Sequence, residues 1–188
     1  TLRLDHGARR VVVGSICAAE PERFSDWLDA FGPERLVAAL DVHIDDDGVP
    51  QPRTHGWTRD TARSLWELLY YYAESGLRHL LCTDIGRDGA MTGPNVALYR
   101  EVAKRYPALH VQASGGVSGL ADLSELAASG ARYAITGKAL LEGVVLLQQR
   151  IKNEDMGAKW RHEEYTSLQA AAAAEAPPQP PDVVPSPT

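Results

Sequence analysis

The sequence predicts an α/β fold in which strands of a parallel sheet alternate with helices. Five short apolar runs, each suited to a buried strand, alternate in strict order with longer segments of helical periodicity. One nine-residue pattern occurs twice, since residues 7–15 read GARRVVVGS and residues 130–138 read GARYAITGK. Glycines and polar residues follow the apolar runs, where parallel α/β folds place their ligands. These three observations together predict five strand–helix units with a ligand site at the strand ends.

The elements can be placed by residue range. We predict strands at 9–13, 35–42, 77–83, 109–113 and 132–136, and helices near 20–31, 58–75, 95–106, 119–129 and 138–151. The longer interruptions at 43–57 and 84–94 are rich in Gly, Asp, Pro and Thr, which is typical of loops. Residues 153–188 contain an alanine run and a proline-rich end, so we predict one domain over 1–152 followed by a disordered, low-complexity tail.

Composition narrows the class of protein. The 188-residue chain has a net charge of −6, which argues against a nucleic-acid partner, and it has no apolar run long enough to cross a membrane. Cys17 and Cys82 are too far apart in sequence for a metal or redox motif. We therefore expect a cytoplasmic protein that acts on a small molecule without a metal or another cofactor.

Both copies of the repeat predict an anion site. Each apolar run ends in a glycine before a helical segment, and backbone N–H groups exposed there suit a phosphate. The second copy follows another glycine signal, so we predict a two-loop phosphate cradle made of Ser114, Gly115, Gly116, Gly137 and Lys138. The first copy offers Gly14 and Ser15, but its expected glycine partner would lie before Thr1, which predicts that the chain is a fragment.

Two architectures accommodate five such units. One is an open, doubly wound sheet; the other is part of a (β/α)₈ barrel, which normally needs about 250 residues. Two equivalent phosphate cradles are natural in a ring of eight units and awkward in a five-stranded sheet. The repeat therefore favours a truncated arc of five βα units from a barrel.

Carboxylates stand at two strand ends. Asp41 ends an apolar strand, and the next apolar run leads into Thr83, Asp84, Arg87 and Asp88. Partial burial raises the pKa of a carboxylic acid, which suits a general acid. For Asp84 and Asp88, turn or helix-capping roles remain open.

Several motifs closely resemble the isomerase of histidine biosynthesis. They are ALD at 39–41, HGW at 55–57, TDIGRDGAMTGPN at 83–95, SGGV at 114–117 and GKAL at 137–140. The resemblance covers about residues 5–145. The related cyclase typically has Ser after the first Thr, so Asp84 and the GPN at 93–95 favour the isomerase.

The resemblance implies a metal-free Amadori rearrangement that converts a bisphosphorylated aminoaldose, the phosphoribosyl-formimino-aminoimidazole-carboxamide ribotide, into its ribulosyl aminoketose. An acid protonates the ribose ring oxygen, and a base removes the C2 proton. Asp41 corresponds to the proton donor, while Thr83 and Asp88 line the site, with Asp88 as second candidate for the acid.

The resemblance also implies the binding residues. Trp57 stacks on the imidazole-carboxamide base, Asp84 and Arg87 lie among the substrate-binding residues, and the two glycine sites bind one phosphate each. In the family, the proton acceptor is an Asp that ends the first strand.

That acceptor strand and the next two are absent here, so the resemblance implies strands 4 to 8 of a barrel. We expect no activity from this chain alone, and we expect its partner to be the missing N-terminal strands, supplied by the same gene product or by another chain. The alternatives are a non-catalytic module that binds phosphate esters, the cyclase, or a dual-substrate isomerase.

Overall fold

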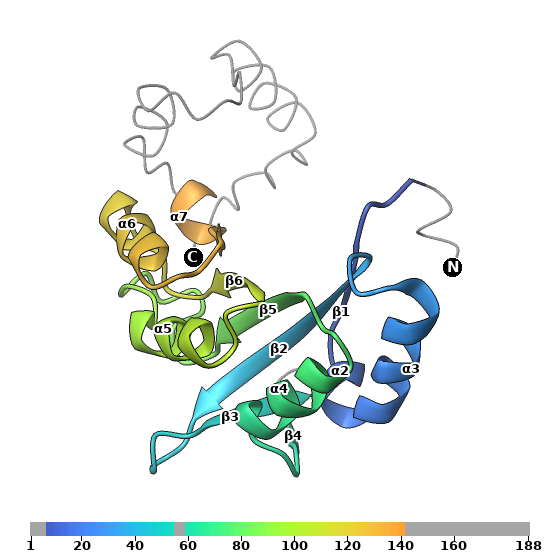
Figure 1. Ribbon diagram of the computed structural model, residues 1–188. Coiled ribbons are helices and arrows are strands. Elements are labelled where there is room, and N and C mark those ends of the chain that lie inside the picture. The colour runs from blue at the N-terminus through green and yellow to red at the C-terminus, as the bar shows by residue number, and fades with distance from the viewer. Residues whose placement is uncertain (1–6, 55–58, 142–188) are drawn as a thin grey trace, which may run out of the picture. The chain divides into compact units, whose positions relative to one another are not determined.

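The computed structural model describes residues 7–54 and 59–141, which belong to one compact unit of the chain, Thr1–Leu147 (Figure 1). The predicted domain boundary near residue 152 and the predicted tail at 153–188 lie outside the described residues, as does the predicted helix beyond residue 141.

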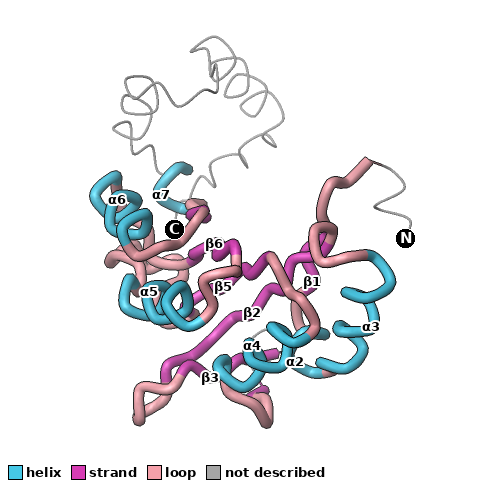
Figure 2. The backbone as a smooth tube through the Cα atoms, in the orientation of Figure 1, coloured by secondary structure: helices cyan, strands magenta, loops and turns pink. Residues whose placement is uncertain are grey.

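Strands and helices alternate along most of the described chain (Figure 2). The strands are β1 (Val11–Val13), β2 (Leu36–Ile44), β3 (Pro50–Thr54), β4 (Arg59–Asp60), β5 (His79–Asp84), β6 (His110–Ser114) and β7 (Tyr133–Ile135). The helices are α2 (Ile16–Ala19), α3 (Pro21–Phe31), α4 (Leu65–Glu74), α5 (Val96–Arg105), α6 (Leu120–Ala128) and α7 (Lys138–Leu141).

Strands β1, β2, β5, β6 and β7 form a parallel series in which each strand lies beside its predecessor. A doubly wound sheet reverses its strand order at a switch point, whereas a barrel adds strands in chain order. The observed parallel α/β sheet is therefore consistent with the (β/α)₈ barrel class.

The prediction of a loop at 43–57 is wrong over much of its length. Strand β2 continues to Ile44, and β3 returns antiparallel to it before pairing with β4. The turn between them depends on Asp45, whose Oδ1 accepts hydrogen bonds from the N–H groups of Asp47 and Val49. The Asp-Gly pair at 47–48, with Gly48 at φ +77°, is a hairpin signal that the proline-rich context obscured.

The predicted helix at 58–75 begins later, at Leu65. Ser64 and Glu67 form a capping box there: Glu67 Oε2 accepts a 2.7 Å hydrogen bond from the Ser64 N–H, and Ser64 Oγ accepts one from the Glu67 N–H. Residues 59–60 belong instead to the short strand β4.

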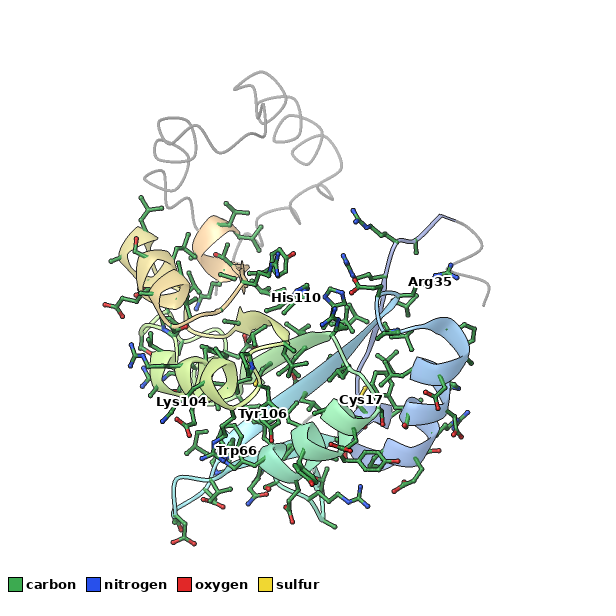
Figure 3. The ribbon with its side chains drawn as sticks, in the orientation of Figure 1. Cys17, Arg35, Trp66, Lys104, Tyr106 and His110 are labelled. Carbon is green, nitrogen blue, oxygen red and sulfur yellow. The ribbon has the colours of Figure 1, made fainter. Side chains whose placement is uncertain are left out.

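One face of the parallel sheet is buried under the helices. Its core residues include Leu40 of β2, Leu80 of β5 and Val111 of β6, together with Phe24 and Tyr72 from the helices. Phe24 packs edge-on against Tyr72 at 5.2 Å between ring centroids. The Tyr72 hydroxyl donates to the backbone oxygen of Cys17, labelled in Figure 3, and so joins α4 to α2.

The opposite face carries residues in register across the strands. Neighbours in register point to the same side of a sheet, so they form rows. The middle row is Ala39, Leu81, Gln112 and Tyr133, and the row nearest the carboxyl ends is Asp41, Thr83, Ser114 and Ile135. Tyr133 is 50% exposed and Ile135 is 43% exposed, so part of this face, with two large apolar side chains, is open to solvent.

Candidate functional site

The row at the carboxyl ends brings together residues that are far apart in the sequence. Asp41 of β2 lies beside Thr83 of β5, and Thr83 lies beside Ser114 of β6. Thr83 is buried, whereas Asp41 and Ser114 are partly exposed. A carboxyl group and two hydroxyl groups therefore stand along one edge of the sheet, at the end where α/β enzymes bind substrates.

A pocket of about 270 Å³ adjoins this row between the loops that follow β5, β6 and β7. It is lined by Asp88, Gly89, Met91, Ser114, Gly115, Gly116, Val117, Ile135, Thr136, Gly137 and Lys138. All five residues of the predicted second phosphate cradle are among them. The two glycine loops thus share one pocket.

Gly115 and Gly116 have a steric role that the sequence did not indicate. Their φ angles are +98° and +87°, and a Cβ on Gly116 would lie 2.4 Å from the backbone oxygen of Gly93. A Cβ on Gly115 would lie 2.7 Å from the Asp84 oxygen. These glycines allow the loop after β5 to lie against the loop after β6, and this close approach accounts for them without any ligand.

Gly137 differs from these two glycines. A Cβ built on it meets no atom within 4 Å, although the residue lines the pocket. Its missing side chain is therefore not required by packing against the described protein atoms, which leaves room for a ligand there.

Lys138 and Asp88 bring opposite charges to the pocket. Lys138 lies at the start of α7, and its Nζ donates a 3.1 Å hydrogen bond to the Gly89 oxygen. Asp88 is exposed in the loop after β5, with its N–H bonded to the Asp84 oxygen at 3.0 Å. The lysine offers a positive charge to an anion and also joins two of the loops that line the pocket.

Asp84 and Arg87, predicted to bind substrate, do not line the pocket. Asp84 is 3% exposed, and its carboxylate accepts hydrogen bonds from the Gly86 N–H and from Asn95 Nδ2. Arg87 Nη1 donates to the oxygens of Thr92 and Gly93. For Asp84, this placement favours the turn and capping role that the sequence left open.

Gly14 and Ser15, the other predicted phosphate site, lie apart from the pocket. They follow β1, which pairs with β2, whereas the pocket lies beside β6 and β7. Their backbone oxygens accept hydrogen bonds from the N–H groups of Cys17, Ala18 and Ala19 in the short helix α2. Their phosphate-binding role stays a prediction. Trp57 lies outside the described residues.

Sequence reasoning missed two residues near the site. Thr136 lines the pocket, and its Oγ1 is buried without a hydrogen-bond partner among the described residues. It belongs to the repeat, which could have indicated it. Arg53 of β3 lies opposite Asp41 in antiparallel register and therefore on the same face. Finding Arg53 required recognition of the hairpin.

Within residues 7–54 and 59–141, no cluster of three or more His, Cys, Asp or Glu could hold a metal ion. No helix in those same ranges is long and apolar enough to span a membrane. Burial raises the pKa of the Cys17 thiol to about 12 and also raises that of Cys82, so both thiols stay protonated at neutral pH.

The comparison with known proteins agrees with the motif resemblance. A family model described as "Histidine biosynthesis protein" matches residues 2–145. The chain is 50% identical over 140 residues to the 1-(5-phosphoribosyl)-5-((5-phosphoribosylamino)methylideneamino) imidazole-4-carboxamide isomerase of Klebsiella pneumoniae subsp. pneumoniae, covering 74% of this chain and 57% of that protein.

Proteins of the same name from two further organisms give similar values. The Citrobacter koseri protein is 46% identical over 149 residues, and the Xanthomonas oryzae pv. oryzae protein is 47% identical over 148 residues. Each alignment covers 79% of this chain and 61% of the relative, so the chain spans about three fifths of these proteins. The chain belongs to the histidine biosynthesis protein family.

Proposed function

We propose that this chain carries the proton-donating half and one phosphate site of an isomerase that converts the bisphosphorylated aminoaldose of histidine biosynthesis into its aminoketose. The observation that carries the proposal is the row of Asp41, Thr83 and Ser114, which ends at a pocket lined by Gly137 and Lys138. The relatives named above bear the name of this isomerase.

The chemistry requires one proton donor and one proton acceptor. Protonation of the ribose ring oxygen opens the sugar, and removal of the C2 proton gives an enolamine that becomes the ketose. Asp41 supplies the donor, and the Thr83 hydroxyl beside it can hydrogen-bond the sugar. The pocket holds a phosphate through backbone N–H groups and Lys138, which fixes the ribose relative to Asp41.

The positions of the two carboxyl groups favour Asp41 over Asp88 as the donor. Asp88 lines the pocket itself, so its carboxylate would face the phosphate at short range. Asp41 stands in the row on the sheet face and does not line the pocket. The sugar, which lies away from its phosphate, is therefore nearer to Asp41.

The acceptor comes from further βα units. The chain covers 57% to 61% of the relatives named above, and within the described residues β1 pairs only with β2 and β7 only with β6. We propose that units like those in the uncovered part of these relatives pair with the outer edges of β1 and β7, complete a barrel with this five-strand arc and supply the base. A cytoplasmic location is part of the same proposal.

Two matched variants test the assignment. In a protein that joins this chain to the uncovered part of a relative, Asp41→Asn keeps the side-chain shape and removes the acidic proton. We expect kcat to fall about 10²–10⁴-fold with KM nearly unchanged, because the interaction lost is made in the transition state. Asp88→Asn is the control. If Asp88→Asn lowered kcat severely and Asp41→Asn left it nearly unchanged, the donor role would pass to Asp88. If the joined protein bound phosphate esters but showed no turnover, the chain would belong to a non-catalytic binding module.

A further inference from the structure

The carboxylate of Asp84 has no part in the proposed chemistry, yet it is among the most completely bonded groups near the site. It ends β5 and is 3% exposed. Its Oδ1 accepts a 2.9 Å hydrogen bond from the Gly86 N–H, and its Oδ2 accepts a 2.7 Å hydrogen bond from Asn95 Nδ2. Asn95 Oδ1 in turn accepts a 3.1 Å hydrogen bond from the Leu98 N–H and so caps α5.

These bonds tie the end of β5 to the start of α5 and close the loop at 85–94. That loop contributes Asp88, Gly89 and Met91 to the pocket. Met91 has φ +53°, a conformation that non-glycine residues seldom adopt and that needs support from its surroundings. The Gly93 N–H bonds to the Gly116 oxygen at 2.9 Å, so the position of the loop also sets the position of the glycine loop after β6.

We infer that Asp84 and Asn95 form a positioning pair that holds the loop at 85–94 in the shape that binds a phosphate ester. The pair acts through the pocket wall and touches no reacting atom; the inference rests on the proposed function. A carboxylate suits residue 84 because it accepts from two donors at once, and a buried charge-assisted hydrogen bond is stronger than a neutral one. If residue 84 carried the amide and residue 95 the carboxylate, the same hydrogen bonds could form, with the donor and the acceptor of the bond between the two side chains exchanged.

That symmetry gives a swap experiment. Asp84→Asn sets an amide against the Asn95 amide, and Asn95→Asp sets a second carboxylate against the buried Asp84 carboxylate. The double variant Asp84→Asn/Asn95→Asp restores an amide–carboxylate pair, keeps an oxygen for the Gly86 N–H and keeps an Asp cap on α5. Asn95→Ser retains a favourable cap but is too short to reach Asp84, so it breaks the pair with the least damage to the helix.

The readout is the affinity of the 188-residue chain for inorganic phosphate, measured from the amide NMR shifts of Gly137 and Lys138. We expect Asn95→Ser, Asp84→Asn and Asn95→Asp each to weaken phosphate binding about tenfold. The affinity of the double variant should recover to within about threefold of that of the original chain. Glu101→Gln is the matched control, because it removes only an exposed ion pair with Arg105 on α5 and should leave phosphate affinity unchanged.

Melting temperature separates positioning from stability alone. Variants that melt earlier yet bind phosphate like the original chain overturn the inference and leave the proposed function standing. The inference is also overturned if Asn95→Ser binds phosphate normally while Asp84→Asn, Asn95→Asp and the double variant all bind it weakly. An original chain that shows no phosphate affinity at all overturns the proposed phosphate site itself.

Discussion

Among single residues, Gly116 is required for the close packing of two loops, whereas Gly137 is placed where a ligand could bind. Gly116 has a positive φ and lies against the Gly93 backbone, whereas Gly137 has open space around its missing Cβ. The sequence predicted one role for both, because glycines that follow apolar runs do not show which of them faces another loop and which faces a pocket.

Gly116→Ala and Gly137→Ala should therefore behave differently. We expect Gly116→Ala to lower the free energy of unfolding by about 1–3 kcal/mol, since the new Cβ meets backbone atoms in a strained conformation. Gly137→Ala should change it by less than about 0.5 kcal/mol while weakening phosphate binding. Urea denaturation and a phosphate titration measure the two effects. Equal loss of stability in both variants would contradict this distinction.

The histidines at the amino ends of β5 and β6 give the chain a pH dependence. His110 is labelled in Figure 3. The rings of His79 and His110 pack edge-on at 4.9 Å between centroids, and Arg132 Nη1 lies 2.7 Å from His110 Nε2. Burial, and then the positive charge of Arg132, lower the pKa of His110 below its ordinary value of 6.5. The unfolded chain therefore takes up a proton at His110 before the folded chain does.

Stability should fall as the pH falls below about 6.5 towards the lowered pKa of His110, and His110 should have no effect above that range. Measurements above pH 5 avoid the titration of Glu34, whose pKa is lowered by its hydrogen bond to His79. His110→Gln should flatten the curve of unfolding free energy between pH 5 and about 7. An unchanged slope in that variant would exclude His110 as the cause.

At the scale of elements, the sequence predicts the five parallel strands but not the hairpin. The apolar runs that lead to Asp41 and Thr83 are short and continuous, as buried parallel strands are, so β2 and β5 could be predicted to within a few residues. Strand β3 contains two prolines and follows three aspartates, a composition typical of loops. Its pairing depends on the turn at Asp45, a contact that residue periodicity does not reveal.

The candidate site shows the same limit. The ends of the apolar runs are visible in the sequence, so Asp41, Thr83 and Ser114 could be placed side by side, although β2 continues past Asp41 to Ile44. The environment of Asp84 could not be predicted in this way, because the role of Asp84 depends on Asn95, which lies eleven residues further along the chain. Sequence position therefore predicted which carboxylates are near the site but not which of them bonds the protein's own loop.

The hairpin turn offers a test at this scale. Asp45→Ala removes two backbone hydrogen bonds and the 2.9 Å bond from Gln51 Nε2. We expect the melting temperature to fall, while exposed Asp46→Ala should have almost no effect. Thermal denaturation of both variants measures this. A silent Asp45→Ala would show that the turn forms without these bonds.

At the scale of the whole molecule, the open sheet face is the feature that connects fold with function. Val12, Tyr133 and Ile135 are 54%, 50% and 43% exposed, and all three lie on strands of the parallel series. Exposed apolar strands at a sheet edge are prone to pairing with other chains. In the proposed barrel, further βα units cover this face and bring the proton acceptor opposite Asp41.

Isomerisation by the separate pieces tests whether the donor and the acceptor lie on different parts of the barrel. The substrate is offered to the purified 188-residue chain, to the uncovered part of a relative, and to the two together. We expect no measurable turnover from the chain alone, turnover from the mixture, and loss of that turnover when this chain carries Asp41→Asn. Robust turnover by the chain alone would contradict the claim that donor and acceptor lie on different parts of the barrel.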